Sequence, residues 1–346
     1  MVTGAAIAGI ALAHPPVTTQ DELWDGFFAK HYSGVQRALA KRIFANSGVR
    51  ARHAVVNPTV EDVSAWSTGR RMQRYLVEAM PLGKSAVADA LAAAGVAATD
   101  VGLFAVCSCT GYVTPGLDIL LARDLGMAAS TQRLNIGHMG CYAALPGLGA
   151  VRDYVRANER PAVLLCLELT SLHVQPATAD AEQIVAHALF ADGAAAVVVT
   201  PEPSGYEVVE VAAVTDTATA DHMTWDVTDL GFRMGLSARV PDVLAVHVAG
   251  MVDGLLGRHG LERSDIGGWA VHPGGPRILD VIATELALPA SALDESRAVL
   301  AEHGNCSSPT VLMVLDEIMR RPQPPPWTVA LAFGPGLTLY AALLRF

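Results

Sequence analysis

The sequence predicts an α/β protein built from two similar halves, and three observations lead to that class. Short apolar runs alternate with segments of helical periodicity along the whole chain. The runs are apolar at nearly every position, as in strands that are buried on both faces of a sheet. The chain has 346 residues, of which 51% are hydrophobic, so it is long enough for two domains or one large duplicated core.

Seven apolar runs are predicted to be strands, and helical patterns lie between them. The first run belongs to an apolar stretch at residues 2–13, which is too short to span a bilayer and has no basic segment before it. We therefore expect neither a signal peptide nor a membrane span. The predicted strands are residues 4–12, 101–107, 162–167, 194–200, 268–271, 328–332 and 337–344. The predicted helices are residues 84–94, 116–125, 143–157, 278–288 and 309–320.

The two halves of the chain have a similar rhythm. Each closes on a glycine-containing segment followed by an apolar strand, at residues 192–194 in the first half and 334–336 in the second. This pattern predicts an internal duplication, with residues 1–205 as one half and residues 206–346 as the other.

Charge and cysteine content narrow the possible functions. The net charge is −10 and the pI is near 5.5, which argues against a general nucleic-acid-binding surface. The five cysteines are odd in number, and their spacing resembles neither a zinc site nor a disulfide framework. A reduced, cytoplasmic protein is expected.

Three polar residues in glycine-containing segments are candidates for chemistry. Cys141 follows Gly140 and precedes a predicted helix, and the helix N-terminus is expected to lower the pKa of its thiol. His272 ends a predicted strand before Pro-Gly-Gly, and Asn305 follows Gly304. Each residue taken alone has an ordinary explanation, as an inert buried cysteine, a core histidine or a helix cap. Together they suggest one site, because we expect each to lie where an apolar strand meets a glycine-containing loop, at the carboxyl edge of a sheet.

These motifs resemble those of the type III polyketide synthases, the chalcone synthase family. The resemblance extends over essentially the whole chain, and it includes Trp-x-x-His-Pro-Gly-Gly at 269–275 and Phe-Gly-Pro-Gly at 333–336. It implies a thiolase-like fold, with two duplicated α/β halves in a layered αβαβα core, and a homodimer in which Thr114 and Pro115 lie at the interface. Cys109 stands where plant members commonly have Thr. A Cys at this position resembles bacterial tetrahydroxynaphthalene and phloroglucinol synthases.

The resemblance also implies the reaction and the residues that carry it. The substrates are malonyl-CoA and an acyl-CoA starter, the reaction is decarboxylative Claisen condensation, and the product is a cyclised pyrone or phenolic. Cys141 would hold the acyl chain as a thioester, and His272 would keep Cys141 as a thiolate. His272 and Asn305 would stabilise the enolate that forms as CO2 leaves. No metal and no cofactor beyond the CoA substrates are expected.

Further positions match the family's substrate cavity and CoA entrance. Phe190 resembles the aromatic gatekeeper between the two. The residues matching the cavity wall and floor are Cys109, Thr170, His173, Met234, Ser307, Phe333, Gly334, Pro335 and Gly336. For the CoA phosphates we expect Arg42, Lys41 and Arg50, since residues 31–60 carry five basic side chains and no Asp or Glu.

Two other functions share parts of this pattern. A ketoacyl synthase that uses acyl-carrier protein has Cys, His and Asn in a related fold, but the Pro-Gly-Gly after His272 favours the CoA-using family. A catalytically silent thiolase-like subunit is the second alternative, and the presence of all three polar residues argues against it.

Overall fold

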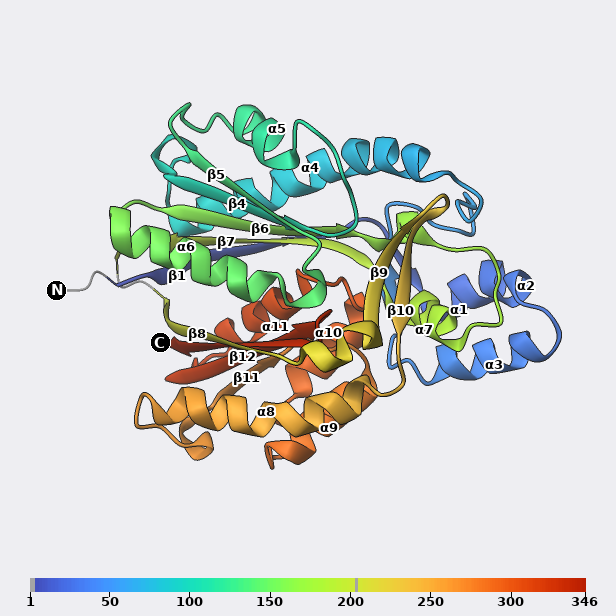
Figure 1. Cartoon of the computed structure of the whole chain (residues 1–346). Coiled ribbons are helices and arrows are strands. Elements are labelled where there is room, and N and C mark those ends of the chain that lie inside the picture. Colours follow the sequence, from blue (N-terminus) through green and yellow to red (C-terminus); the bar gives the residue numbers. More distant parts are fainter. Residues whose placement is uncertain (1–3, 203–204) are drawn as a thin grey trace.

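The structure, a computed structural model, describes residues 4–202 and 205–346 (Figure 1). The strands are β1 (Ala6–Ala13), β2 (Val17–Thr19), β3 (Ala51–His53), β4 (Leu103–Ser108), β5 (Gln132–Gly137), β6 (Ala162–Leu169), β7 (Asp192–Thr200), β8 (Tyr206–Thr215), β9 (Met223–Thr228), β10 (Gly231–Leu236), β11 (Gly268–Val271), β12 (Trp327–Gly334) and β13 (Thr338–Arg345). The helices are α1 (Gln20–Leu23), α2 (Ala29–His31), α3 (Gly34–Ala45), α4 (Thr68–Ala94), α5 (Leu117–Asp124), α6 (Ala144–Asn158), α7 (Ala181–Leu189), α8 (Val240–Gly257), α9 (Pro276–Glu285), α10 (Asp294–His303) and α11 (Thr310–Met319).

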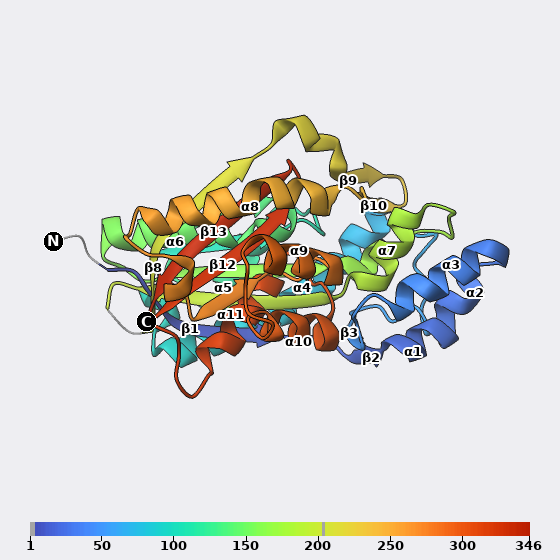
Figure 2. The ribbon, with the colours of Figure 1, turned by 90° about the horizontal axis from the view of Figure 1, so that it is seen from below.

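The central sheet has the strand order β11-β12-β13-β8-β1-β7-β6-β4-β5. Its two parts are joined by a narrow contact, because β1 pairs with β8 only through Ala6 with Glu207 and Ile7 with Tyr206. The helices α6 and α11 fill the space between the two parts and share one apolar core with both (Figure 1). Helices α4 and α5 cover the outer face of one part, and α8 and α9 cover the outer face of the other (Figure 1). Seen from below, α8 and α9 lie on the near side of the molecule (Figure 2). The predicted layered αβαβα core is therefore confirmed.

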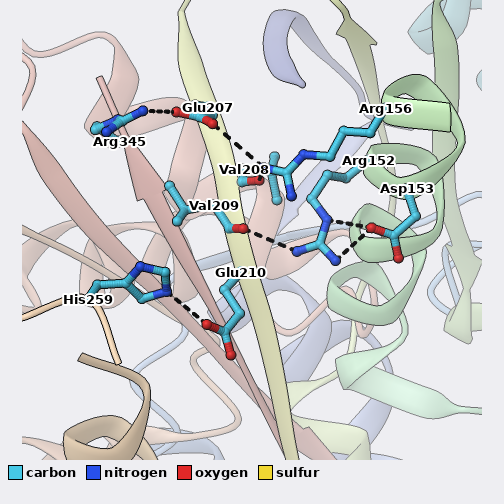
Figure 3. A network of polar contacts seen from close by, with 9 residues as sticks. All are labelled: Arg152, Asp153, Arg156, Glu207, Val208, Val209, Glu210, His259 and Arg345. Atoms are coloured by element: carbon cyan, nitrogen blue, oxygen red, sulfur yellow. Dashed lines mark hydrogen bonds and ion pairs between the residues drawn. The ribbon is translucent and has the colours of Figure 1, made fainter. Parts of the chain in front are cut away.

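Arginines of α6 stabilise β8 near the place where it stops pairing with β1. Arg156 donates to the carbonyl of Val208 at 3.1 Å, and Arg152 donates to the carbonyl of Val209 at 3.4 Å (Figure 3). Backbone carbonyls without a strand partner need such donors when they are partly buried. The two arginines therefore connect the middle layer to the second part of the sheet.

All seven predicted strands are present, and the predicted helices are present with shifted ends. The largest difference is α4, which runs for 27 residues through Pro81, whereas the sequence predicts a helix only over 84–94. Strand β5 was not predicted, because its residues are mostly exposed and lack an apolar pattern. Several other elements were not predicted either: β2, β3, β8, the β9–β10 hairpin, and the helices α1, α2, α3, α7, α8 and α10.

One helix, α8, is long and apolar enough to cross a membrane by length and composition alone. Half of its residues are buried, and it packs against α9, β8 and β13. A core helix of a folded domain has the same properties, and α8 occupies that position here.

Candidate active site

Cys141 lies in a short helical turn, Gly140–Tyr142, between β5 and α6. Gly140 has a φ of +74°, and a Cβ at this position would lie 2.9 Å from the Pro335 side chain. A Cβ on Gly334 would likewise crowd the Tyr142 ring at 2.8 Å and lie 3.4 Å from the backbone nitrogen of Cys141. Glycines at both positions therefore allow the turn after β12 to pack directly against the cysteine.

His272 follows β11 and is fully buried. Its backbone N–H continues the sheet pattern by donating to the Leu331 carbonyl at 2.8 Å. The imidazole meets the ring of Phe333 edge-on, with the centroids 5.6 Å apart. Neither ring nitrogen has a protein hydrogen-bond partner. A buried polar atom without a hydrogen-bond partner costs free energy, so a partner is expected when the site is in use. Both nitrogens are therefore available to a substrate or to the proton of a nearby group.

Asn305 follows α10, so it does not lie at a strand end as the sequence analysis expected. The strand before Cys141, β5, is also exposed rather than apolar. Asn305 is held instead by backbone bonds to the segment around Phe190: its N–H donates to Leu189 and its carbonyl accepts from Ala191. A loop paired with a loop has no periodicity in the sequence, which explains why the expectation was wrong.

The side chain of Asn305 has a defined orientation. Its Oδ1 accepts a hydrogen bond from the backbone N–H of Ser307 at 2.8 Å, so the opposite end of the amide presents its N–H groups. The Asn305 and Ser307 side chains both hydrogen-bond to Cys141 and favour its thiolate. A carboxamide donor and a sulfur nucleophile are thus adjacent.

One cavity of about 540 Å³ is lined by all three candidate residues, Cys141, His272 and Asn305. Phe190, Met234 and Phe333 line the same cavity. The remaining wall is mainly apolar, with further polar side chains at Asn46, Ser47, Glu182, Ser237 and Arg277. This combination is typical of a small-molecule site.

Burial dominates the protonation of Cys141 and His272. It raises the pKa of the Cys141 thiol to about 12, although the hydrogen bonds from Ser307 and Asn305 act in the opposite direction. Burial also lowers the pKa of His272 to about 3. The lowered cysteine pKa expected from the helix N-terminus is therefore not found, because desolvation of the sulfur exceeds the effect of its hydrogen bonds. Burial thus favours the neutral thiol and the neutral imidazole in the free site.

Phe190 and Met234 stand between the large cavity and two smaller ones. Both residues line the 540 Å³ cavity, a pocket of about 20 Å³ beside Cys141, and another of about 60 Å³ beyond it. The Phe190 carbonyl accepts a hydrogen bond from buried Arg52 at 2.9 Å. Phe190 therefore has the location that a gatekeeper requires.

The other residues predicted to line the substrate cavity are divided between the two small pockets. Cys109, Thr170, Ser307 and Pro335 line the pocket of about 20 Å³ beside Cys141. His173 lines only the more distant pocket, and both of its ring nitrogens are engaged, with the Thr110 carbonyl and the Phe232 N–H.

The residues of the Phe333 to Gly336 segment, which the sequence predicts as the cavity floor, differ in how close they lie to the cavities. Phe333 lines the large cavity, and Gly334 packs against the Cys141 backbone. Gly336 lies in the turn between β12 and β13, where its φ is +139° and a Cβ would crowd Thr338. It is not among the residues that line these cavities.

Two residues of the site were missed in the sequence. Trp225 of β9 lines both small pockets, and its indole N–H donates to the Cys109 carbonyl at 2.7 Å. Glu168 of β6 is fully buried and accepts hydrogen bonds from the Cys109 N–H, the Thr110 hydroxyl and the Ser308 hydroxyl at 2.7–2.9 Å. The single acid in the apolar run of β6 was the available signal for Glu168.

The basic residues expected at a CoA entrance do not line the large cavity. Arg42 and Lys41 are exposed on α3, and Arg50 forms an ion pair with Glu302 at 3.3 Å. The cavity mouth is lined instead by Asn46, Ser47 and Arg277, among others. The Asn46 amide donates to the Arg42 carbonyl, so α3 still borders the mouth.

Comparisons with known proteins match the chain over nearly its whole length. Residues 3–203 match the family model described as chalcone and stilbene synthases, N-terminal domain, and residues 210–346 match the corresponding C-terminal domain. A 1,3,6,8-tetrahydroxynaphthalene synthase of Streptomyces peucetius subsp. caesius is 38% identical, covering 90% of this chain and 85% of its own. The alpha-pyrone synthesis polyketide synthase-like Pks18 of Mycobacterium tuberculosis is 31% identical, covering 99% and 91%.

Solved structures show the same architecture. The crystal structure of 1,3,6,8-tetrahydroxynaphthalene synthase from Streptomyces coelicolor A3(2) has a TM-score of 0.93 at 30% identity and covers 99% of each chain. PKS-I from the brown alga Ectocarpus siliculosus also has a TM-score of 0.93 at 30% identity, covering 100% of this chain and 99% of its own.

Proposed function

Because the chain belongs to the family of chalcone and stilbene synthases, we propose that it joins malonyl units to a short acyl starter held on Cys141. The chain is a type III polyketide synthase, an acyl-transferring enzyme that acts on CoA thioesters to give pyrone or phenolic products. The single observation that carries the residue assignment is the cavity shared by Cys141, His272 and Asn305.

The first step loads the starter onto Cys141. The thiol transfers its proton to His272 as the sulfur attacks the starter thioester, because neither charge is stable alone in this cavity. A new carbon–sulfur bond forms to Cys141, the bond to the CoA sulfur breaks, and the departing CoA thiolate takes the proton from His272. His272 is then neutral, with one ring N–H.

The second step is decarboxylation and condensation. The bond between the malonyl α-carbon and its carboxylate breaks, CO2 leaves, and the electron pair forms an enolate on the thioester. The Asn305 amide and the His272 N–H are the donors for that oxygen, and such preorganised donors in a dry site lower the barrier. The α-carbon then attacks the acyl carbonyl on Cys141, the carbon–sulfur bond breaks, and the departing Cys141 thiolate takes up one proton from solvent, which restores the thiol. No cofactor beyond the CoA substrates is needed in this scheme.

The two alternative functions have less support. Both family models match the chain in the correct order, and the relatives named above are polyketide synthases of this type. These findings favour the CoA-using synthase over a ketoacyl synthase dependent on acyl-carrier protein. They also favour it over a catalytically silent subunit, because the polar atoms of His272 are left without partners, as in a site that receives a substrate.

The size of the inner pocket supports a short starter, such as a malonyl or acetyl unit. The pocket beside Cys141 has a volume of about 20 Å³, and Trp225, Thr170, Phe190 and Met234 line both this pocket and the one of about 60 Å³ beyond. A long alkyl chain that runs from Cys141 through these two pockets would have to displace the indole and break its hydrogen bond to Cys109. The tetrahydroxynaphthalene synthase relative fits a phenolic product, whereas the Pks18 relative fits a pyrone.

The Trp225→Ala variant is expected to accept longer starters. Removing the indole joins the two small pockets, so kcat/KM for a medium-chain acyl-CoA should rise relative to acetyl-CoA by about tenfold or more. Products from malonyl-CoA and a panel of starters are measured by liquid chromatography and mass spectrometry. Trp327→Ala, which changes a tryptophan outside these pockets, is the matched control. A wild-type enzyme that prefers long-chain starters would contradict the proposal.

The His272→Gln variant is expected to make alkylation of Cys141 slow and strongly pH-dependent. Without the imidazole, the thiol has no base to take its proton, and burial still raises its pKa. The thiolate fraction is then very small at pH 7 and rises about tenfold per pH unit below that pKa. Iodoacetamide labelling of the Cys141 peptide should slow by at least tenfold at pH 7, whereas His259→Gln should match the wild type. Equal rates and flat profiles in both variants would show that His272 does not activate the sulfur.

We also propose which residues contact CoA, where the two halves of the chain divide, and where the protein is located. Arg42, Lys41 and Arg50 remain candidates for contacts with CoA phosphates, now together with Arg277 at the cavity mouth. Residues 1–205 and 206–346 are proposed as the duplicated halves, which the narrow contact between β1 and β8 supports. A cytoplasmic location is proposed because the substrates are CoA thioesters.

A homodimer through the edge strand β5 is proposed as the assembled form. This strand ends the central sheet, and an unpaired edge favours pairing with another chain. Apolar side chains are exposed beside it: Leu134 is 37% exposed, Ile119 40% and Tyr112 69%. Thr114 and Pro115 are also exposed next to this surface, as an interface position requires.

The Leu134→Asp variant is expected to shift the protein from dimer to monomer. A carboxylate at the centre of a buried apolar contact would be left without a partner. Sedimentation velocity measures the change. Val246→Asp, which alters an exposed apolar residue on α8, should leave the dimer intact. A wild-type protein that is monomeric at micromolar concentration would contradict the proposed interface.

A further inference from the structure

Three histidines from distant parts of the chain meet outside the large cavity, and one of them, His53, also lines the pocket of about 60 Å³. His14 directly follows β1, His53 ends β3, and His303 ends α10. One ring nitrogen from each lies within 4.8 Å of the other two. The three rings stack with centroids 4.5–5.2 Å apart, and all three side chains are partly exposed.

The hydrogen bonds of the cluster leave nitrogen lone pairs in its centre. The Pro15 carbonyl can only accept, so the His53 Nδ1–H donates to it at 2.8 Å, and Nε2 of His53 therefore carries a lone pair. The Nδ1–H of His303 donates to that Nε2 at 3.1 Å, so His303 must move its proton to Nε2 before its Nδ1 can act as a ligand. Nδ1 of His14 is buried and has no partner. A backbone carbonyl that fixes the outer nitrogen of a histidine is the arrangement typical of metal-bound imidazoles.

The spacing is close to that of a metal site. Two imidazole nitrogens bound to a tetrahedral Zn²⁺ at about 2.0–2.1 Å lie roughly 3.3 Å apart. The His53–His303 distance is near this value, and the third nitrogen, which lies within 4.8 Å of the other two, must move closer to join them. The rings are nearly parallel, at 17–28°, so they must tilt for the lone pairs to converge, and their partial exposure leaves room for this.

The surroundings favour the neutral imidazoles that metals bind. Burial lowers the pKa of all three side chains, and that of His14 to about 3. Repulsion from neighbouring rings adds to the effect for His14 and His303. The nearby carboxylate of Glu302 is paired with Arg50. Each ring can therefore offer a nitrogen ligand without first releasing a proton.

We propose that His14, His53 and His303 form a site for a divalent transition-metal ion of the zinc type, with water as the fourth ligand. The site is a structural clamp and takes no part in the condensation chemistry. It joins the chain after β1 to two segments that carry the active site. His303 is followed by Gly304 and Asn305, and His53 follows Arg52, which donates to the Phe190 carbonyl.

The test is Zn²⁺ binding to the full-length, tag-free protein, measured by isothermal titration calorimetry and by metal analysis after dialysis. We expect one Zn²⁺ per chain, and at a hundredfold excess over Kd a rise in Tm of roughly 3 °C or more. His14→Gln and His303→Gln should each weaken binding by at least tenfold. His259→Gln, a histidine paired with Glu210 on the surface, should bind as the wild type does.

Co²⁺ provides a second measurement that needs no variant. A tetrahedral nitrogen–oxygen site gives visible bands without the charge-transfer absorption of a cobalt–thiolate bond, which separates this cluster from Cys141 and Cys109. Binding that persists in both variants, a thiolate-type Co²⁺ spectrum, or no Zn²⁺ binding at micromolar concentration would each overturn the proposal. None of these results depends on whether the chain is a polyketide synthase.

Discussion

Cys141→Ala is expected to lose chain extension by at least about 10⁴-fold while it still decarboxylates malonyl-CoA to acetyl-CoA within about tenfold of the wild-type rate. The variant has no sulfur to hold the acyl chain, so condensation has no electrophile in the cavity. The proposed donors for the enolate, His272 and Asn305, are unchanged, and the cavity gains only the volume of one sulfur atom. The two activities should therefore separate in a single substitution.

The assay follows acetyl-CoA, extended products and consumption of malonyl-CoA by mass spectrometry. Cys166→Ala is the matched control, because it removes a thiol that is equally buried but lies in β6, outside the cavities described above. It should retain both activities if the fold is intact. Chain extension by Cys141→Ala, or parallel loss of both activities in a folded protein, would show that Cys141 is not the acyl carrier.

Asn305→Asp is expected to reduce malonyl-CoA decarboxylation by about 10²- to 10³-fold. The carboxylate has the same size and can still accept the Ser307 N–H, but it removes the amide donor and places negative charge where the enolate forms. Loading of the starter should fall less than decarboxylation, because His272 still accepts the Cys141 proton, although the variant also loses the Asn305 hydrogen bond that favours the thiolate. The variant should accumulate acyl-enzyme that it cannot extend.

Two measurements separate loading from decarboxylation. Intact-protein mass spectrometry after incubation with the starter measures acyl loading, and the formation of acetyl-CoA from malonyl-CoA gives the rate of decarboxylation. Asn158→Asp makes the same chemical change at an exposed amide on α6 and should leave both activities unchanged. Equal decarboxylation by Asn305→Asp and the wild type would exclude the amide as the enolate donor. Loss of acyl loading in the folded variant would instead assign Asn305 to the first step.

The layered fold was predictable because its main strands are buried on both faces. Such strands appear in the sequence as unbroken apolar runs, and those of β6, β7 and β12 show this pattern clearly. Edge and surface elements carry no such signal. The exposed strand β5 and the mixed pattern of the β9–β10 hairpin were therefore missed, and with the hairpin the wall residue Trp225 was missed as well.

The candidate site was predictable in part. Cys141, His272 and Asn305 stand beside glycines that the local geometry requires, and Gly140 and Gly304 both have positive φ. Their common cavity depends on pairing between the Asn305 loop and the Phe190 segment, which no sequence period encodes. The protonation of Cys141 was not predictable either, since it depends on burial in the folded chain and not on the neighbouring helix alone.

The most direct measurement is peptide mapping of the wild-type protein after incubation with a short acyl-CoA in the absence of malonyl-CoA. The account predicts one acyl group per chain, attached to the peptide that contains Cys141 and released when malonyl-CoA is added as extended product forms. An acyl group on Cys109 or another cysteine, or no covalent adduct in a preparation that makes product, would contradict it.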